Sequence, residues 1–147
     1  MKHLTDLERA KEELLSCHEL KCVLKKGSTT YQSQKRGVAP MLDFLEQKLE
    51  LSGFSAADRV VGKATAYLFV LAGVTAVWSD VMSEAAQAVL NRYGIPCTAN
   101  KIVPYIINRS GDGACPMETA VQTITEPALA YAAIKETQQR LLKAKRN

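Results

Sequence analysis

The sequence is poor in the residues that most often hold a metal ion. Only two of its 147 residues are histidines, and no two of its four cysteines form a Cys-x-x-Cys pair. Structural zinc sites need paired cysteine or histidine ligands at short spacing. We therefore expect no metal site and no cofactor. The histidines are His3 and His18, and the cysteines are Cys17, Cys22, Cys97 and Cys115.

A long hydrophobic run is also missing. The longest apolar stretch, residues 64–78, contains Gly73 and is too short to span a bilayer. The first fifteen residues carry charges throughout, unlike a signal peptide. These features predict a cytoplasmic protein with no membrane partner, in a compartment where disulfides are rare.

No strong excess of one charge is present. The chain has 19 basic and 15 acidic residues, a formal net charge of +4. Basic residues gather within 21–36 and 143–146, where solvated surface is the favoured interpretation and an RNA-binding patch the less favoured one. The length predicts a single domain over residues 1–147 with a hydrophobic core. A homodimer is compatible with these features.

Hydrophobic periodicity predicts alternating helices and strands. The Ser55 and Asp58 pair has the spacing of a capping box, which predicts a helix from 55 to 72. Ser83 can cap the helix 84–93, and Gly94 is suited to end it. The other predicted helices are 4–16, 40–50, 116–124 and 127–144, and the predicted strands are 20–25, 28–33, 74–80 and 100–107.

This order predicts an α/β protein, a three-layer α/β/α sandwich with a mixed sheet. The strand–helix–strand unit over 74–107 should be parallel and right-handed. Ligands in such sheets bind at the carboxyl ends of the strands. Lys63, Ser83 and the loop after Ile107 are expected near that edge, where they would line one pocket.

The segment NRSGDGACPMET, residues 108–119, has an unusual composition for a loop. Pro116 at the first helical position places Cys115 at the N-cap and Glu118 at N3, as in a capping box. Sulfur is a weak acceptor, so Ser, Thr or Asp would cap a helix better. A thiolate would instead be favoured by the free N–H groups and the positive end of the helix dipole.

The rest of this loop suggests an anion site. Gly111 and Gly113 allow backbone N–H groups to turn inward around an anion, and Asn108 and Arg109 can complete the clamp. Two interpretations stay open: a reactive thiol at Cys115 beside an anionic ligand, or a half-buried cysteine in a tight turn.

Lys63 is a second candidate site residue because it precedes a nearly uninterrupted apolar stretch. A partly buried lysine loses its proton more easily or holds an anionic ligand. On the predicted helix, Asp58 would lie one turn earlier and could pair with it. The alternative is a lysine that extends along the edge of a layer. The spacing of Gly62 and Ala66 suggests close backbone packing nearby.

Three segments together resemble a prokaryotic family described only as a domain of unknown function, with a cytidine-deaminase-like fold. They are ADRVVGKATAYL (57–68), SEAAQAVLNRYGI (83–95) and NRSGDGACPMETAV (108–121). The last is the most specific, although Ser110 stands where that family usually has an acidic residue. The resemblance covers nearly the whole chain and implies the deaminase-like fold with a pocket.

The resemblance also implies loss of the deaminase reaction. Deaminases of this fold carry His-Ala-Glu or Cys-Ala-Glu at one helix start and Pro-Cys-x-x-Cys at the next. This chain reads Lys63-Ala64-Thr65 at the first position and Met82-Ser83-Glu84-Ala85-Ala86 at the second. The zinc ligands and the catalytic glutamate are missing from these positions, so zinc-activated water is not expected.

Three functions follow as hypotheses. The first is a metal-independent enzyme acting on a nucleotide-like or phosphorylated small molecule, with Cys115 as nucleophile and Lys63, Asp58 or Glu118 as charge or proton-transfer partners. The second is a binding module that holds a nucleotide-like, anionic ligand without chemistry. The third is an RNA-binding accessory protein. The expected ligand-binding residues are Gly62, Ser83, Asn108, Arg109, Gly111 and Gly113.

Overall fold

The computed structural model describes residues 4–107, 111, 113 and 115–146. Its centre is a five-stranded sheet with the order β2-β1-β3-β4-β5. The first two strands form the expected antiparallel hairpin, β1 also pairs antiparallel with β3, and β3, β4 and β5 are parallel. The prediction of an α/β protein with a mixed sheet is thus confirmed. The strands are β1 (Cys22–Lys26), β2 (Thr29–Ser33), β3 (Ser55–Val61), β4 (Ala76–Ser83) and β5 (Cys97–Val103).

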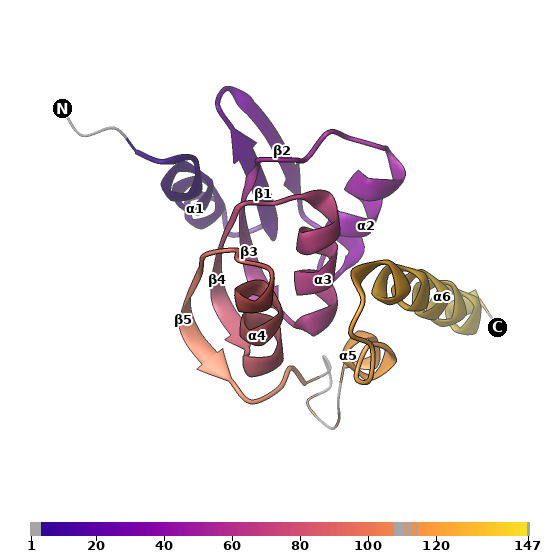
Figure 1. Cartoon of the computed structure of the whole chain (residues 1–147). Coiled ribbons are helices and arrows are strands. Elements are labelled where there is room, and N and C mark those ends of the chain that lie inside the picture. Colours follow the sequence, from indigo (N-terminus) through magenta and orange to yellow (C-terminus); the bar gives the residue numbers. More distant parts are fainter. Residues whose placement is uncertain (1–3, 108–110, 112, 114, 147) are drawn as a thin grey trace.

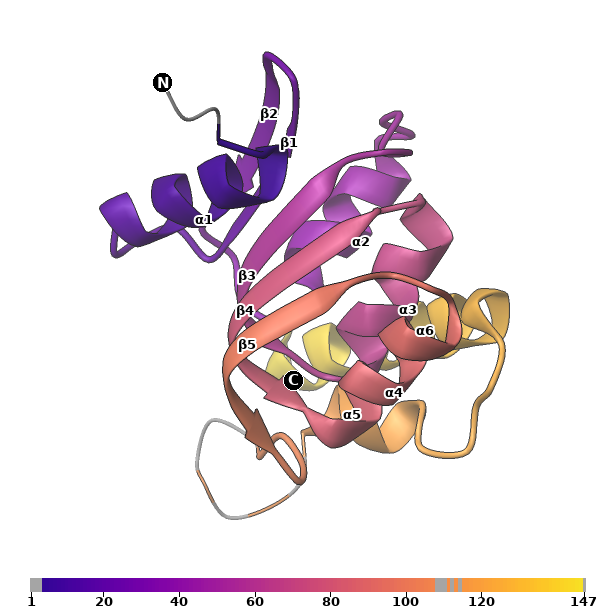
Figure 2. The ribbon, with the colours of Figure 1, turned by 60° about the vertical axis from the view of Figure 1, so that its left-hand side comes forward.

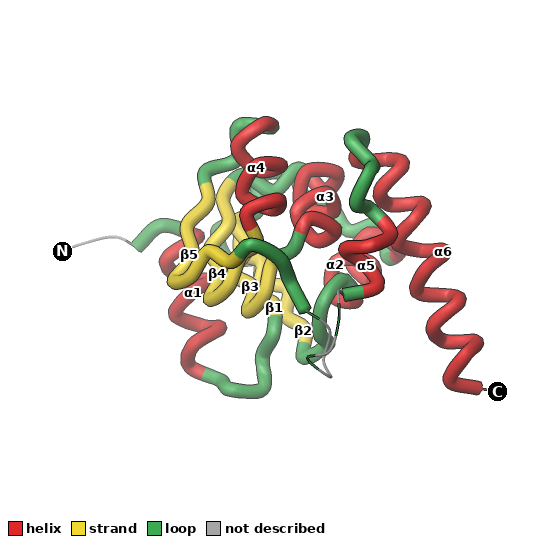
Figure 3. The backbone as a smooth tube through the Cα atoms, turned by 90° about the horizontal axis from the view of Figure 1, so that it is seen from below, coloured by secondary structure: helices red, strands yellow, loops and turns green. Residues whose placement is uncertain are grey.

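Helices cover the sheet unequally. Helix α1 lies on one face against β1, β3 and β4, whereas α3 and α4 lie on the other face with α2 beside α3 (Figures 1 and 2). Helices α5 and α6 pack on α3 beyond the sheet, so α3 has neighbours on both sides (Figures 1 and 3). The helices are α1 (Asp6–Ser16), α2 (Ala39–Glu46), α3 (Lys63–Ala72), α4 (Glu84–Arg92), α5 (Pro116–Ala120) and α6 (Pro127–Arg146).

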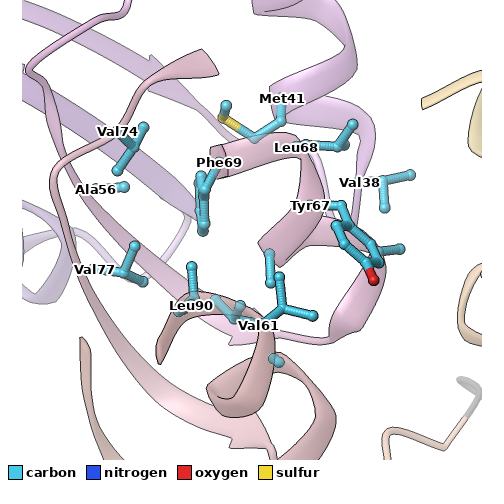
Figure 4. Packing of buried hydrophobic residues seen from close by; sticks show 14 of the residues in the cluster. Val38, Met41, Ala56, Val61, Tyr67, Leu68, Phe69, Val74, Val77 and Leu90 are labelled. Atoms are coloured by element: carbon cyan, nitrogen blue, oxygen red, sulfur yellow. The ribbon is translucent and has the colours of Figure 1, made fainter. Parts of the chain in front are cut away.

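Two hydrophobic clusters occupy the two faces of the sheet. The larger one joins β3 and β4 to α2, α3, α4 and α6, and Figure 4 shows Tyr67, Phe69 and Leu90 within it. The smaller one lies under α1 and includes Leu14, Ala57 and Trp78. Residues 64–69 of α3 are all buried. A helix this apolar on every side is expected between two packed layers.

The prediction of a helix beginning at Ser55 is wrong. Residues 55–61 form β3, and the helix begins only at Lys63 with Gly62 as its N-cap. The strand has Ala56 in the larger cluster and Ala57 in the smaller one, so it is buried on both faces. Because both faces are covered, its sequence SAADRVV shows no regular alternation of apolar and polar residues, so a periodicity test does not identify it as a strand.

The residues at the two ends of α4 predicted its position correctly. The Ser83 hydroxyl accepts a hydrogen bond from the N–H of Ala86 at 3.1 Å, as an N-cap serine should. Gly94 has φ of 72°, and the N–H of Ile95 returns to the carbonyl of Leu90 at 2.9 Å. This is the helix ending expected from the Gly-Ile pair.

Strand β5 ends just before a proline. It runs over Cys97–Val103, three residues earlier at its start than predicted, and Pro104 follows it. Proline has no N–H to donate to a ladder, so pairing stops there and the chain turns away from the sheet. Within the described ranges, no helix combines the length and the apolar composition that a membrane crossing requires.

A core substitution tests the double-sided packing of α3. Leu68 is fully buried, and Leu68→Ala should lower the free energy of unfolding by about 2–5 kcal/mol because it leaves a cavity. The control is Leu142→Ala on α6, where the side chain is 50% exposed and the change should stay within about 0.5 kcal/mol. Urea unfolding followed by circular dichroism measures both, and similar costs at the two positions would contradict this packing.

Candidate functional site

The carboxyl ends of the parallel strands meet at one edge of the sheet, and a cavity of about 370 Å³ lies there. We call it the strand-end cavity. It lies where ligands are expected in sheets of this kind. Four parts of the chain form it: the start of α3, the start of α4, the segment after β5, and α5 with its following turn. Its described lining consists of Lys63, Ser83, Ala85, Pro104, Tyr105, Ile106, Glu118, Thr119 and Gln122.

The Glu118 carboxylate caps the N-terminus of α3. Its Oε1 accepts a hydrogen bond from the N–H of Lys63 at 2.6 Å, and its Oε2 accepts one from the N–H of Ala64 at 3.0 Å. First-turn N–H groups have no partner within their own helix, and a negative charge near them is stabilised by the helix dipole. The end of α3 that could hold an external anion is therefore occupied by a side chain of this protein.

Gly62 makes this contact possible. A Cβ atom at position 62 would overlap the carboxylate of Glu118, so that side chain would have to move away from α3. The backbone of Gly62 is extended, with φ −99° and ψ −178°, so left-handed geometry is not the reason for glycine here. The reason is the close approach of the carboxylate. Close packing was expected around Gly62, and the group that packs closely against it is the Glu118 carboxylate.

Lys63 joins α3 to the turn that follows α5. Its Nζ donates a hydrogen bond to the carbonyl of Gln122 at 3.0 Å and lies 5.8 Å from the ring centre of Tyr67. The Tyr67 hydroxyl donates to the carbonyl of Ile124 at 2.8 Å. Burial raises the pKa of Tyr67, so its phenol remains a hydrogen-bond donor. Lys63 contributes a positive charge to the cavity wall.

Ser83 and the segment after β5 complete the cavity. Ser83 is almost fully buried, and its hydroxyl oxygen is already used as the cap of α4. Tyr105, 70% exposed, and Ile106 provide an apolar wall. The sequence analysis did not identify these two residues, nor Thr119 and Gln122. The feature of the sequence that could have identified Tyr105 and Ile106 was Pro104. It marks the end of β5, and the residues that follow the end of this strand line the strand-end cavity.

Cys115 is the N-cap residue of α5, as predicted, but the capping box is not formed. Its side chain makes no cap hydrogen bond, and Glu118 contacts α3 instead of the Cys115 backbone. The N–H of Cys115 donates to the carbonyl of Ile106 at 3.4 Å, and its carbonyl accepts from the N–H of Thr119 at 3.0 Å. Its backbone thus adjoins two lining residues, although Cys115 itself is not in the described lining.

Two of the four residues of the predicted anion clamp belong to the described part of the chain. Asn108 and Arg109 lie outside the described residues. Gly111 has φ of 75°, the left-handed conformation expected of a turn glycine, and both Gly111 and Gly113 are exposed. The clamp and the reactivity of Cys115 therefore stay predictions. Among the described residues, no three or more of His, Cys, Asp and Glu cluster as metal ligands would.

Asp58 belongs to a different cavity, so the predicted pairing with Lys63 is wrong. It lines a cavity of about 390 Å³ between β3 and the segments that flank the β1–β2 hairpin, which we call the hairpin-side cavity. The pairing assumed a helix, but residues 55–61 are extended. Asp58 is 3% exposed and lies opposite Cys22 in the ladder between β1 and β3.

The environment of Asp58 favours its neutral form. Burial raises the pKa of Asp58 well above its usual range, while N–H groups of Val60 and Arg59 and the Cys22 thiol oppose the shift. Burial, with the nearby Asp58 carboxyl, also raises the pKa of the Cys22 thiol. A carboxyl group held this way titrates at higher pH than an exposed one, because charging it inside the protein costs desolvation energy.

The raised pKa predicts how stability responds to pH in Asp58→Asn. The folded state binds the Asp58 proton more tightly than the unfolded chain, so this contribution to stability is full below the unfolded pKa. It is lost as pH rises through the raised folded pKa. Asparagine stays neutral, so the variant should gain stability relative to wild type as pH rises above about 4, the usual pKa of an aspartate in an unfolded chain. Urea unfolding at a series of pH values above this point measures the difference, with Glu12→Gln, at an exposed carboxylate, as the control for removing one acidic group. A difference independent of pH would contradict the assignment.

A double-mutant cycle tests the contact between Gly62 and Glu118. Gly62→Ala should lower the free energy of unfolding by about 1–3 kcal/mol, because the new methyl group displaces a charged hydrogen-bond acceptor. In a Glu118→Ala background the same substitution should cost much less, because the displaced carboxylate is no longer present. Alanine adopts the extended backbone of position 62 without strain. Equal costs in the two backgrounds would show that the carboxylate is not what excludes a side chain at position 62.

Comparisons with known proteins agree with this architecture. The chain is similar to the crystal structure of a DUF1893 family protein (TM1506) from Thermotoga maritima, with a TM-score of 0.77, 20% sequence identity, and coverage of 95% of this chain and 92% of that chain. At this identity the likeness concerns the fold alone. No curated protein matches the sequence significantly. The sequence model of TM1506, described as a domain of unknown function (DUF1893), matches residues 10–138. The chain therefore belongs to the DUF1893 family.

Proposed function

We propose that this protein binds a small anionic, nucleotide-like molecule in the strand-end cavity and does so without zinc. The observation that carries the proposal is the convergence of two helix starts and the segment after β5 on one cavity. This convergence brings a lysine, a serine and a tyrosine together from three separate parts of the chain. Small-molecule sites are commonly concave, mostly apolar and fitted with a few polar groups.

The position of the cavity supports a cytidine-deaminase-like, three-layer interpretation of the fold. Helices α3 and α4 each follow a parallel strand, and their first residues line the same cavity. Deaminases of this fold hold zinc at two such successive helix starts. Lys63 and Ser83 stand at the corresponding places here, where an ammonium group and a hydroxyl group can bind a ligand but do not form a zinc site.

The lining also indicates the class of ligand. Lys63 supplies the positive charge for an anionic group, and the exposed ring of Tyr105 with Ile106 offers a flat apolar wall for a heterocycle. Thr119 and Gln122 add hydrogen-bonding groups. The volume of about 370 Å³ lies in the range of sites for small organic ligands.

The hydrogen bonds that the polar groups of the cavity already form favour ligand binding over catalysis. Both Glu118 oxygens already accept hydrogen bonds from α3, and the Lys63 ammonium already donates to Gln122. A general acid or base must come within hydrogen-bond distance of the substrate atom to which it gives, or from which it takes, a proton. Cys115 is kept as nucleophile in the second candidate function, a metal-independent transferase or hydrolase, because its backbone contacts the cavity residues Ile106 and Thr119.

Titration calorimetry with uridine monophosphate tests the binding function. Lys63→Met keeps most of the apolar stem but removes the charge, and it should weaken binding by about 10-fold to 100-fold. Lys143→Met on α6, outside the strand-end cavity, is the matched control and should bind like wild type. Binding should also survive both a chelator and Cys115→Ser.

Two results would count against this function. Equal affinities of wild type and Lys63→Met would remove the lysine from the binding site. A ligand that is converted by wild type but not by Cys115→Ser would favour the enzymatic candidate instead.

A further inference from the structure

The hairpin-side cavity is separate from the strand-end cavity and shares no described lining residue with it. It lies between β3 and two connecting segments, one before β1 with His18 and Lys21 and one after β2 with Arg36 and Gly37. Its volume of about 390 Å³ is also in the range of small-molecule sites. The cavity carries polar groups that the function proposed above does not use.

Its wall contains a buried acceptor without a partner. The Oδ2 atom of Asp58 forms no hydrogen bond with any described group, although Asp58 is only 3% exposed. The carboxyl group is otherwise served by the Cys22 thiol and by backbone N–H groups of Arg59 and Val60. Buried polar atoms without a partner are rare in folded proteins, and each one is costly to maintain. A ligand N–H group at Oδ2 would satisfy this atom and would favour the ionised form of a carboxyl group that burial otherwise keeps neutral.

The lining of the cavity also includes two basic side chains, Lys21 and Arg36, while its second carboxylate, Asp80, is paired with Arg59. Lys21 donates from Nζ to the carbonyl of His18, and the exposed Arg36 forms no ion pair with a described residue. These two cations can bind an anionic group, and a guanidinium binds carboxylate or phosphate with two parallel hydrogen bonds.

Arg59 is set aside as the anion receptor because most of its donors are already in use. Four of its five N–H groups are bonded: three to the carbonyls of Leu14, Cys17 and Leu20 at the end of α1, and one to Asp80 at 3.3 Å. Its role is to hold α1 against the sheet. The anion-binding capacity therefore rests with Lys21 and Arg36.

We propose that the hairpin-side cavity binds a small molecule that presents an N–H donor to Asp58 and an anionic group to Lys21 and Arg36. Two sources supply this chemistry: a nucleoside phosphate whose base carries an exocyclic amino group, and an amino acid with its ammonium and carboxylate groups at opposite ends. A molecule with the anion alone leaves Asp58 Oδ2 unsatisfied. It should bind more weakly than an aminated molecule of the same size.

Matched ligand pairs test this site by titration calorimetry. Adenosine monophosphate is compared with purine riboside monophosphate, in which a hydrogen atom replaces the amino group, and 4-aminobutyrate is compared with pentanoate. We expect the amino member of at least one pair to bind about tenfold more tightly or better. The first pair identifies a nucleotide ligand and the second an amino acid. Absence of a preference in both pairs would overturn the proposal.

Variants assign the preference to this cavity. Asp58→Asn, which is nearly isosteric, should abolish the preference for the amino member, and Arg36→Ala at the exposed mouth should weaken both members of that pair. Lys63→Met should leave the preference unchanged, so failure of the strand-end site and failure of this one are distinguishable. A preference that persists in Asp58→Asn would also overturn the proposal. If Asp58→Asn does not fold, an affinity for the amino member that is the same in Arg36→Ala as in wild type would overturn the proposal.

Discussion

The carboxylate of Glu118 on the first N–H groups of α3 is the contact on which the carboxyl-terminal third of the structure depends. Helix α5 has only five residues, Pro116–Ala120, too few to be stable alone. Its position is fixed by Glu118, by the bond from Lys63 to Gln122, and by the bond from Tyr67 to the turn before α6. Helix α6 then closes the outer side of α3 and buries the aliphatic face that the sheet leaves uncovered.

The same contact determines what the strand-end cavity can do. A helix N-terminus is a ready anion site, but here an internal carboxylate occupies it, and for this reason the proposed function assigns the external anion to Lys63. The neighbouring helix start is similarly occupied, because the Ser83 hydroxyl caps α4. Part of the first-turn N–H groups of both helices is thus already bonded in the free protein. This arrangement suits a preorganised binding site better than a site that needs free acids and bases.

Local sequence signals predicted those parts of the fold that local interactions determine. Proline at the first helical position marked α5 and α6, Ser83 marked α4, and Lys26-Gly27 marked the hairpin turn. Residues 55–61 were misassigned because the capping-box spacing is a short-range pattern. Their strand conformation is set by pairing with β1 and β4, whose residues lie more than a dozen positions away. Strand propensity depends strongly on such a context.

The candidate site could be predicted from the sequence only in part. Sheet topology correctly brought Lys63 and Ser83 to one cavity together with Glu118. The partner of Glu118 was not predictable, because the two groups are 55 positions apart and the local pattern offered the Cys115 backbone as a nearer alternative. Asp58 was assigned to the wrong cavity for the reason that its strand was mistaken for a helix. Each error therefore comes from a contact that no short window of sequence contains.

Amide hydrogen exchange at the start of α3 tests the central contact most directly. First-turn amides normally exchange fast because they lack partners within their helix. If Glu118 caps α3, the amides of Lys63 and Ala64 should be protected in wild type and exposed in Glu118→Ala. The Ala86 amide, capped by Ser83, should keep its protection in both proteins. Equal exchange at Lys63 and Ala64 in the two proteins would contradict the account.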